Sequence, residues 1–435
     1  MQYLYYKYSS KYLYHSYWSY VPDFVHCCRF SRQHNIMAER LKRKARQQQK
    51  TNEYTIHNKV KIVRGGADYF RCIEEIANNA KYTIHLQTYI FDEDETGNMV
   101  ASALIKAAKR NVAVYMLIDA YASQKLSAAF ISRLKEAGIH FAYFRPLIIS
   151  NFFYLGRRLH HKVVVADSAV CMVAGINISN RYNDVGDSKA WLDWAIYVEG
   201  EVASQLNKVC IHTWNRSPIR KKYNAEIPIQ PALPTEECLV RIRRNDWVYR
   251  HTQITRSYRE LFNTAHAHAT IMTSYFWPPQ KLLKCMAAAA GRGIKIQLIL
   301  TAKADVPFAK YAERYLYNWL FRHNIEVYEY EKNILHGKLA ERDNEWITAG
   351  SYNVNNISAF ASVELNLDVK NMAIATEMND KLQAIINNDC RQITETEFTA
   401  ANNLLKRFYY YLSYRLIHVV FYLFTFYFTQ KRERS

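Results

Sequence analysis

The chain has 435 residues, enough to bury a sizeable core and to form two domains of ordinary size. Its residues are 49% hydrophobic and 22% charged, a balance that excludes a wholly disordered protein. The formal net charge of +19 suits an anionic partner, either nucleic acid or an acidic membrane face, although a basic surface also serves solubility alone.

The first zone, residues 1–57, is rich in tyrosine at its start and basic later on, without a clean period. It has no uninterrupted apolar stretch before a small-residue cleavage site, so we expect no secretory signal. The eight cysteines of the chain form no Cys-x-x-Cys pair and have no metal-type spacing with histidine. This cysteine usage favours a reducing compartment.

Residues 58–216 alternate between helical and strand patterns. The segments with helical apolar spacing are 67–79, 99–110 and 129–137, and those typical of strands are 83–91 and 112–119. A linker at 217–237 follows and holds four of the nine prolines of the chain.

The alternating pattern returns in residues 238–393 as an internal repeat. Residues 270–276 echo 83–89, and residues 287–300 echo 105–118. We therefore predict an α/β fold of two tandem α/β/α domains related by pseudo-two-fold symmetry, with a cleft at their interface.

The repeat is sharpest at four polar positions, and each pair is separated by the same 176 residues. The pairs are His160 with His336, Lys162 with Lys338, Asp167 with Asp343, and Asn177 with Asn353. A single His-x-Lys is common by chance, whereas a fourfold coincidence of this kind is not. We therefore interpret the two segments as matching halves of one site.

In each copy the motif lies on a strand–turn–strand pattern. A period of two along a strand puts His160 and Lys162 on one face, about 7 Å apart. Asp167 falls at the following turn, where a carboxylate is typically an acceptor for backbone N–H groups. The short residues at 174–175 and 350–351, including Ser351, let the chain approach a bound anion closely.

Two imidazoles, two ammonium groups and two amides that converge on one point indicate a phosphate site. The Lys and Asn groups neutralise phosphoryl oxygens as charge develops. One imidazole attacks phosphorus, and the other protonates the leaving alcohol and later deprotonates the acceptor. No carboxylate cluster indicates a divalent ion, so we expect neither a metal nor a cofactor.

These motifs resemble the phospholipase D superfamily and, within it, the bacterial cardiolipin synthases. The flanking segments 86–91, 94–97, 191–193 and 363–366 are also similar to that family, and the resemblance covers roughly residues 60–393. It implies phospholipase D-like domains, with His160 as the nucleophile and His336 as the acid and base, although paired imidazoles allow the reverse assignment. It also implies that Asp193 and Glu364 orient the two histidines.

One departure from the family pattern concerns the second motif. Many members follow the second Gly-Ser-x-Asn with an Asp-x-Arg-Ser segment, but residues 355–358 here read Asn-Asn-Ile-Ser. The arginine of that segment is missing. Head-group contacts that depend on it do not carry over, whereas the paired His and Lys residues are unaffected.

The last zone, residues 394–435, is apolar and basic. Residues 408–428 are almost wholly aromatic or aliphatic, and helical spacing gathers the polar side chains of 407, 411, 415, 418 and 422 into one stripe. This pattern favours an interfacial helix in the headgroup layer, with Lys431, Arg432 and Arg434 against anionic lipid. A spanning helix, disfavoured by Arg415 near its middle, and a helix packed on the protein's own surface are the alternatives.

The resemblance and the tail together predict a phosphatidyltransferase at the cytoplasmic face of an anionic membrane. It would make cardiolipin and glycerol from two phosphatidylglycerol molecules through a phosphohistidine. The alternative is a phospholipase D-type phosphodiesterase that hydrolyses phospholipid or nucleic acid. The membrane-like tail disfavours nucleic acid as the substrate. The two intact motifs disfavour a non-catalytic membrane scaffold.

Overall fold

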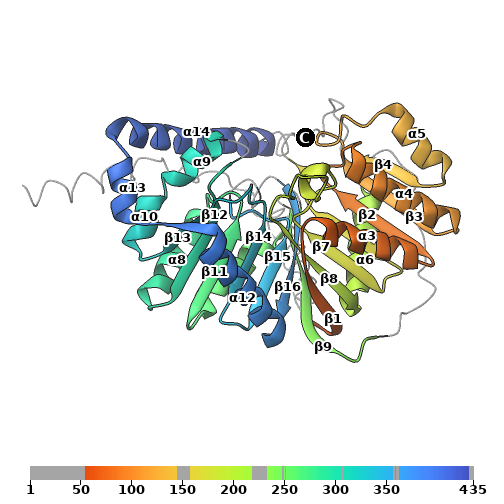
Figure 1. Cartoon of the computed structure of the whole chain (residues 1–435), viewed down its shortest axis with the longest axis horizontal. Helices are drawn as coiled ribbons and strands as arrows, with labels where there is room; N and C mark the ends of the chain where they lie inside the picture. Colours follow the sequence, from red (N-terminus) through yellow and green to blue (C-terminus); the bar gives the residue numbers. More distant parts are fainter. Residues whose placement is uncertain are drawn as a thin grey trace, which may run out of the picture. The chain divides into compact units, whose positions relative to one another are not determined.

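A computed structural model describes residues 54–144, 157–217, 233–246, 249, 251–304, 307–355, 358 and 362–430, with only the helical backbone described for 420–430. These residues belong to one compact unit, Tyr54–Ser435. Most of the predicted N-terminal zone, most of the proline-rich linker and the basic end at 431–435 lie outside the described residues. Figure 1 shows the described part as two α/β halves side by side.

The first half is a mixed sheet in the order β4-β3-β2-β6-β7-β8-β1, in which β2, β3 and β4 are parallel. Its strands are β1 (Thr55–Arg64), β2 (Thr83–Thr88), β3 (Ala113–Asp119), β4 (His140–Phe144), β6 (Lys162–Ala166), β7 (Val170–Ala174) and β8 (Trp194–Gly200). Its helices are α3 (Ala67–Asn79), α4 (Glu95–Lys109), α5 (Ala128–Glu136), the 3-10 turn η1 (Asn180–Tyr182) and α6 (Glu201–Asn215).

The second half repeats this arrangement in the order β17-β13-β12-β11-β14-β15-β16-β9, again with three parallel strands, β11, β12 and β13. Its strands are β9 (Glu237–Asp246), β10 (His251–Thr252), β11 (His268–Thr273), β12 (Lys295–Thr301), β13 (Glu326–Tyr330), β14 (Lys338–Arg342), β15 (Trp346–Gly350), β16 (Ser362–Lys370) and β17 (Cys390–Ile393). Its helices are α7 (Gln253–Thr264), α8 (Gln280–Gly291), α9 (Pro307–Arg314), α10 (Tyr317–Arg322), α12 (Met372–Asp389), α13 (Glu395–Ala401) and α14 (Leu404–Gln430).

The predicted tandem α/β architecture is confirmed by this repeated strand order. The local predictions were close, and the main difference is that α4 begins at Glu95 rather than Met99. Its first turn is polar, so apolar periodicity does not mark it. The Asp94 carboxylate caps the helix by accepting a hydrogen bond from the Gly97 N–H at 3.0 Å.

The two halves are joined by backbone pairing as well as by side chains. Strand β1 of the first half pairs with β8 and also with β9 of the second half. The two-residue strand β5 (Arg158–Leu159) runs parallel to the start of β16. These crossings fix the two motif strands relative to each other.

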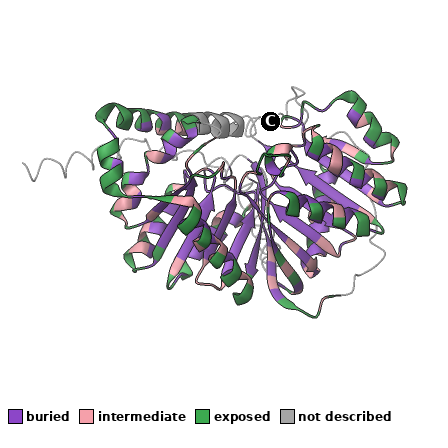
Figure 2. Cartoon of the chain, viewed as in Figure 1, coloured by how far each residue is buried: buried purple, intermediate pink, exposed green. Residues whose placement is uncertain are grey.

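A shared apolar cluster lies where the halves meet. It is drawn from both sheets, for example Val163, Ile196, Met272, Leu339 and Leu365, all of them almost fully buried. Each such side chain contributes about 1.5–3 kcal/mol through removal from water. Figure 2 shows this buried interior continuing across the middle of the molecule.

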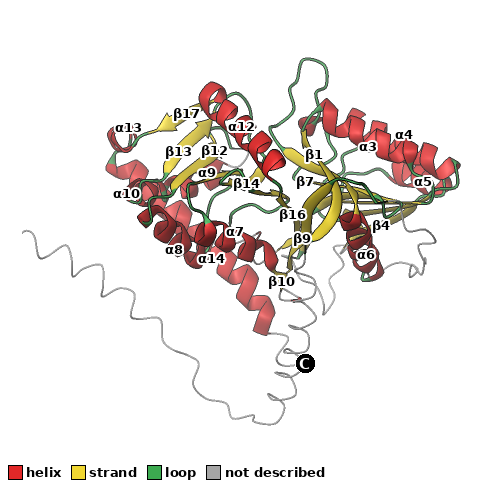
Figure 3. Ribbon diagram, turned by 90° about the horizontal axis from the view of Figure 1, so that it is seen from below, coloured by secondary structure: helices red, strands yellow, loops and turns green. Residues whose placement is uncertain are grey.

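The C-terminal helix α14 lies along the outside of the second half next to α9, as Figures 1 and 3 show from two directions. None of the described helices is both long enough and apolar enough to cross a bilayer.

Candidate active site

The motif histidines stand just before strands β6 and β14, at the junction of the two halves. The His160 N–H donates to the carbonyl of Val363 at 3.0 Å, and the His336 N–H donates to the carbonyl of Leu192 at 2.8 Å. Each acceptor belongs to the other half of the molecule. Backbone hydrogen bonds between the halves therefore hold both histidines in place.

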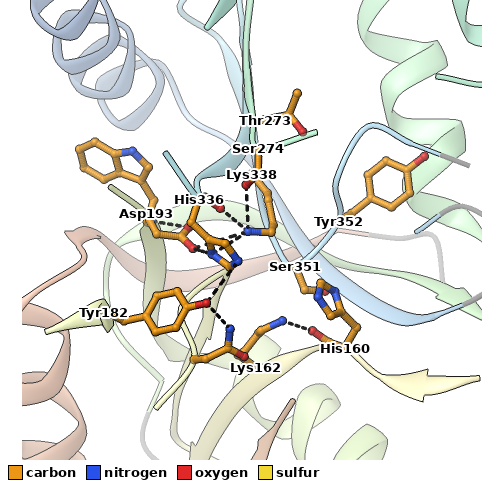
Figure 4. Close-up of polar contacts among 12 residues, drawn as sticks. His160, Lys162, Tyr182, Asp193, Thr273, Ser274, His336, Lys338, Ser351 and Tyr352 are labelled. Atoms are coloured by element: carbon orange, nitrogen blue, oxygen red, sulfur yellow. Dashed lines mark hydrogen bonds and ion pairs between the residues drawn. The ribbon is translucent and has the colours of Figure 1, made fainter. Parts of the chain in front are cut away.

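The side chains cross in the same way. His160 Nδ1 lies 2.9 Å from Glu364 Oε2, and His336 Nδ1 lies 2.6 Å from Asp193 Oδ2. Each half thus supplies one histidine and the carboxylate that holds the other histidine, as Figure 4 shows for His336 and Asp193. A bond at Nδ1 leaves Nε2 as the nitrogen that is free of the carboxylate in both rings.

Burial and charge make the two histidine–carboxylate pairs unequal. Burial raises the pKa of Asp193 to about 6, against the opposing effect of Lys338. Burial also pushes the pKa of Glu364 upward, but His160, Lys162 and Ser351 together outweigh burial and hold that pKa below its usual range. Burial lowers the pKa of His160, which Glu364 offsets only in part. The imidazole of His160 is therefore neutral to lower pH than an exposed histidine.

The two lysines are buried beside their own histidines. Lys162 Nζ donates to the carbonyl of His160 at 2.5 Å, and Lys338 Nζ donates to the carbonyl of His336 and lies 3.5 Å from Ser274 Oγ. Burial, followed by repulsion from Lys338, lowers the pKa of Lys162 to about 7. Two ammonium groups forced together in this way favour the arrival of an anion.

Ser351 binds a carboxylate in this structure. Its hydroxyl donates to Glu364 Oε2 at 2.5 Å, the same oxygen that meets His160. The small residue Gly175 leaves room for a carboxylate, because a Cβ at this position would collide with both oxygens of Asp193. Both small residues therefore accommodate the carboxylates that orient the histidines, and the close approach of the chain to a bound anion stays a prediction.

The two motif asparagines differ. Asn177 Oδ1 accepts from the Ile90 N–H at 3.2 Å, and its Nδ2 donates to the Tyr182 hydroxyl at 2.9 Å. Both ends of this amide are therefore used within the protein. The Oδ1 of Asn353 is buried without a hydrogen-bond partner among the described residues.

The motif aspartates lie at turns and bind backbone, as their turn position predicted. Asp167 has φ 52° and accepts from the N–H groups of residues 81, 82 and 83 at 2.7–2.8 Å. Asp343 has φ 56° and accepts from residues 266, 267 and 268 at 2.8–3.1 Å. Neither side chain contacts a motif histidine or lysine.

Three aromatic residues to which the sequence analysis assigned no role surround the histidines. The Tyr89 ring lies 4.9 Å from His160 and 5.3 Å from Lys162 Nζ. The Tyr182 and Trp191 rings lie 5.0 and 6.0 Å from His336. The Tyr182 hydroxyl is 3.5 Å from His336 Nε2, as the dashed line in Figure 4 marks.

Among the described residues, no group of three or more His, Cys, Asp or Glu side chains is arranged to hold a metal ion. The polar groups at the site are instead two imidazoles and two ammonium groups. Each imidazole is oriented by one carboxylate, and the second motif segment at 355–358 contributes no arginine. This set can bind a phosphodiester anion and act on it by nucleophilic and acid–base steps.

Two repeated α/β halves, each with a His-x-Lys motif that meets the other at their interface, define the phospholipase D-like class of enzymes. A sequence model described as "Cardiolipin synthase, PLD-like domain" matches residues 73–214 and 258–386. Cardiolipin synthase B of Salmonella typhi is 33% identical over 343 residues, which cover 78% of this chain and 83% of the relative. Cardiolipin synthase B of Escherichia coli K12 is 31% identical over 346 residues, with the same coverage. The chain therefore belongs to the cardiolipin synthase family of phospholipase D-like phosphatidyltransferases.

Solved structures share the fold at low sequence identity. Phosphatidylserine synthase of Haemophilus influenzae superposes with a TM-score of 0.67 at 15% identity, covering 88% of this chain and 99% of that one. Polyphosphate kinase of Porphyromonas gingivalis gives a TM-score of 0.53 at 13% identity and covers 78% of this chain and 49% of that one. Both comparisons support the tandem fold.

Proposed function

We propose that this protein joins two phosphatidylglycerol molecules into cardiolipin and releases glycerol. The observation that carries the proposal is the crossed arrangement, in which each half supplies a histidine and the carboxylate that orients the other half's histidine. This arrangement supports a mechanism in which the two imidazoles act on one phosphate in different roles. Membership of the cardiolipin synthase family supports the choice of lipid.

In the first step, His160 Nε2 attacks phosphorus of the first phosphatidylglycerol. The bond from phosphorus to the glycerol oxygen breaks, and His336 gives its proton to that oxygen, so glycerol leaves. The product on the protein is a phosphatidyl-His160. The lowered pKa of His160 supports this role, because a neutral imidazole is the nucleophilic form.

In the second step, a second phosphatidylglycerol places its terminal hydroxyl at the phosphorus. His336, now neutral, takes the hydroxyl proton while the new P–O bond forms and the P–N bond to His160 breaks. The product is cardiolipin, and both histidines return to their starting protonation states. Asp193 stabilises the imidazolium of His336 before the first step and again after the second.

The lysines and the burial of the site support phosphoryl transfer. Lys162 and Lys338 neutralise charge that builds up on the non-bridging oxygens. The side chains of His160 and His336 are only 17% and 12% exposed, which favours a lipid alcohol over bulk water as the acceptor.

The test is mass spectrometry of lipids after incubation of the purified protein with phosphatidylglycerol vesicles. We expect cardiolipin and an equal amount of glycerol. Replacing His160 or His336 by Asn should each reduce turnover by at least about a hundredfold, the range of general acid–base and nucleophilic effects. Met372→Ala, at a 72%-exposed position on α12, is the matched control.

Intact-protein mass spectrometry separates the two roles. His336→Asn should accumulate a phosphatidyl adduct that is labile in acid, whereas His160→Asn should accumulate none. The reverse result would exchange the assigned roles. Phosphatidic acid as the only product would identify water as the acceptor, and the absence of any lipid product would contradict the proposed function.

A further inference from the structure

Helix α14 has three distinct faces along residues 404–419. One face is packed on the protein and includes Tyr410 and Ser413, which are 6% and 4% exposed. A second face carries the exposed cations Arg407 and Arg415. The third face is apolar and open to solvent, and its members are Leu405 (62% exposed), Phe408 (57%), Leu412 (48%), Leu416 (47%) and Val419 (52%).

These five residues follow the 3.6-residue period and therefore form one continuous stripe on the outer side of the helix. In Figure 2 the described part of this helix is drawn largely as exposed. Single exposed leucines are common on soluble proteins, but a stripe of five large apolar side chains over four turns is typical of an interaction surface.

The neighbouring helix α9 extends this surface. Its Phe308 and Tyr311 are 37% and 46% exposed, and the rings of Tyr311 and Tyr315 lie 5.9 and 4.6 Å from those of Tyr410 and Tyr414 of α14. We call α9 together with residues 404–419 the α9–α14 platform. Its edge is rich in tyrosine, which suits a boundary between water and apolar chains.

The platform is fixed firmly to the second half by buried charges. Lys310 Nζ of α9 lies 2.7 Å from Glu313 and 2.9 Å from Glu329 of strand β13, and all three side chains are nearly fully buried. Arg314 and Tyr317 also reach Glu329, at 3.0 and 2.8 Å. Because α9 is anchored to β13, the platform has a set orientation relative to the sheet.

That orientation puts the platform on the same side as the site. Tyr89 follows the carboxyl end of β2 and Ser274 follows that of β11, and both contact the motif lysines. Helix α9 begins six residues after β12 ends, and β12 runs parallel to β11. The site and the platform therefore lie at the same carboxyl edge of the parallel strands, the upper edge in Figure 1.

We infer that the α9–α14 platform docks on an anionic lipid bilayer and turns the site toward the lipid headgroups. The inference rests on the proposed function, because a substrate held in a bilayer requires the mouth of the site to face that bilayer. The stripe enters the apolar boundary of the headgroup layer, while Arg407 and Arg415 pair with lipid phosphates. A second copy of the chain would match the apolar stripe but not its two cations.

The test uses full-length protein and flotation with vesicles of phosphatidylglycerol and phosphatidylcholine. Leu412→Asp combined with Leu416→Asp places two charges on the stripe, opposite the packed face, so folding should be retained and is checked by thermal unfolding. Burial of one leucine is equivalent to about a tenfold change in affinity, so the double variant should bind at least about tenfold more weakly. Met372→Asp, an exposed apolar position away from the platform, is the control and should float as the wild type does.

A second readout separates this inference from the proposed function. The ratio of turnover on vesicles to turnover on detergent-dispersed phosphatidylglycerol should fall about tenfold in the double variant. Flotation does not need turnover, so it tests the platform even if the protein makes no cardiolipin. Wild-type flotation of the double variant would overturn the inference, and a change from dimer to monomer with unchanged flotation would assign the stripe to a second copy.

Discussion

At the scale of single residues, the site owes its chemistry to charges that burial forces together. Among the described residues, no carboxylate lies at ion-pair distance from Lys162, and a second ammonium, Lys338, raises the cost of its charge. A phosphate anion that arrives between the two removes this cost. Phosphate binding and the protonation of Lys162 are therefore coupled.

This coupling predicts the alkaline limb of the pH profile. Since the pKa of Lys162 is lowered to about 7, the ammonium is charged below that pH and lost above it. The value of kcat/KM, which reports the free enzyme, should fall as pH rises through about 7 rather than near the usual lysine value of about 10.4.

The measurement is kcat/KM between pH 5 and 10 on detergent-dispersed phosphatidylglycerol, where vesicle charge does not interfere. Lys162→Ala should lose about two orders of magnitude in kcat/KM, and the midpoint of its alkaline limb should differ from that of the wild type. Lys61→Ala, at an exposed lysine of β1, should leave the limb in place. A wild-type limb near pH 10 would contradict the assignment to Lys162.

The residue that sequence reasoning missed most clearly is Tyr182. The 176-residue repeat revealed the His and Lys pairs because both copies are present, but it aligns Tyr182 with Ser358. No periodic signal therefore marks the tyrosine. Its contact with His336 Nε2 depends on the η1 turn and on the Asn177 amide, which only the folded chain brings together.

At the scale of elements, the two motif aspartates stabilise the strand–turn–strand units. Asp167 has a left-handed backbone, φ 52°, and accepts three backbone N–H groups just before β2. Asparagine tolerates the same conformation, so Asp167→Asn removes the charge without straining the turn. Three charge-assisted hydrogen bonds then weaken together.

We expect Asp167→Asn to reduce the free energy of unfolding by about 2–3 kcal/mol, and Asp343→Asn to do the same in the second half. Urea unfolding followed by circular dichroism measures the change. Asp68→Asn is the control, because its exposed pair with Arg71 should contribute less than about 1 kcal/mol. An unchanged unfolding midpoint in both aspartate variants would contradict a structural role for these turns.

Local elements were largely predictable because the strands β3 and β12 carry continuous apolar runs and the helices carry a 3.6-residue period. The exchange of carboxylates between the two halves was not predictable. The resemblance to the family implied that Asp193 and Glu364 orient the histidines, but the sequence contains no information on which half supplies which partner. That choice depends on the parallel pairing of β5 with β16, a two-residue strand too short to leave a pattern.

At the scale of the whole molecule, the exchange of strands and carboxylates makes the two halves one catalytic unit. The first half contributes Asp193 to His336 and β1 to β9, and the second contributes Glu364 to His160 and β16 to β5. A half on its own would expose the shared apolar cluster and leave its buried histidine without a carboxylate.

Division of the chain within residues 218–232, between the two predicted domains, tests this dependence. Neither fragment alone should turn over phosphatidylglycerol, because each holds only one histidine and the carboxylate meant for the other half's histidine. Co-expression of the two fragments should restore turnover and yield a complex that co-purifies, since the β1–β9 and β5–β16 pairings re-form without the linker. Turnover by a single fragment as a monomer, measured by cardiolipin formation, would show that one His-x-Lys motif is sufficient. Turnover by a single fragment only as a homodimer would show that two copies of the same half can rebuild the crossed pairing of histidine and carboxylate. Crossed pairing would then still be required, but two different halves would not.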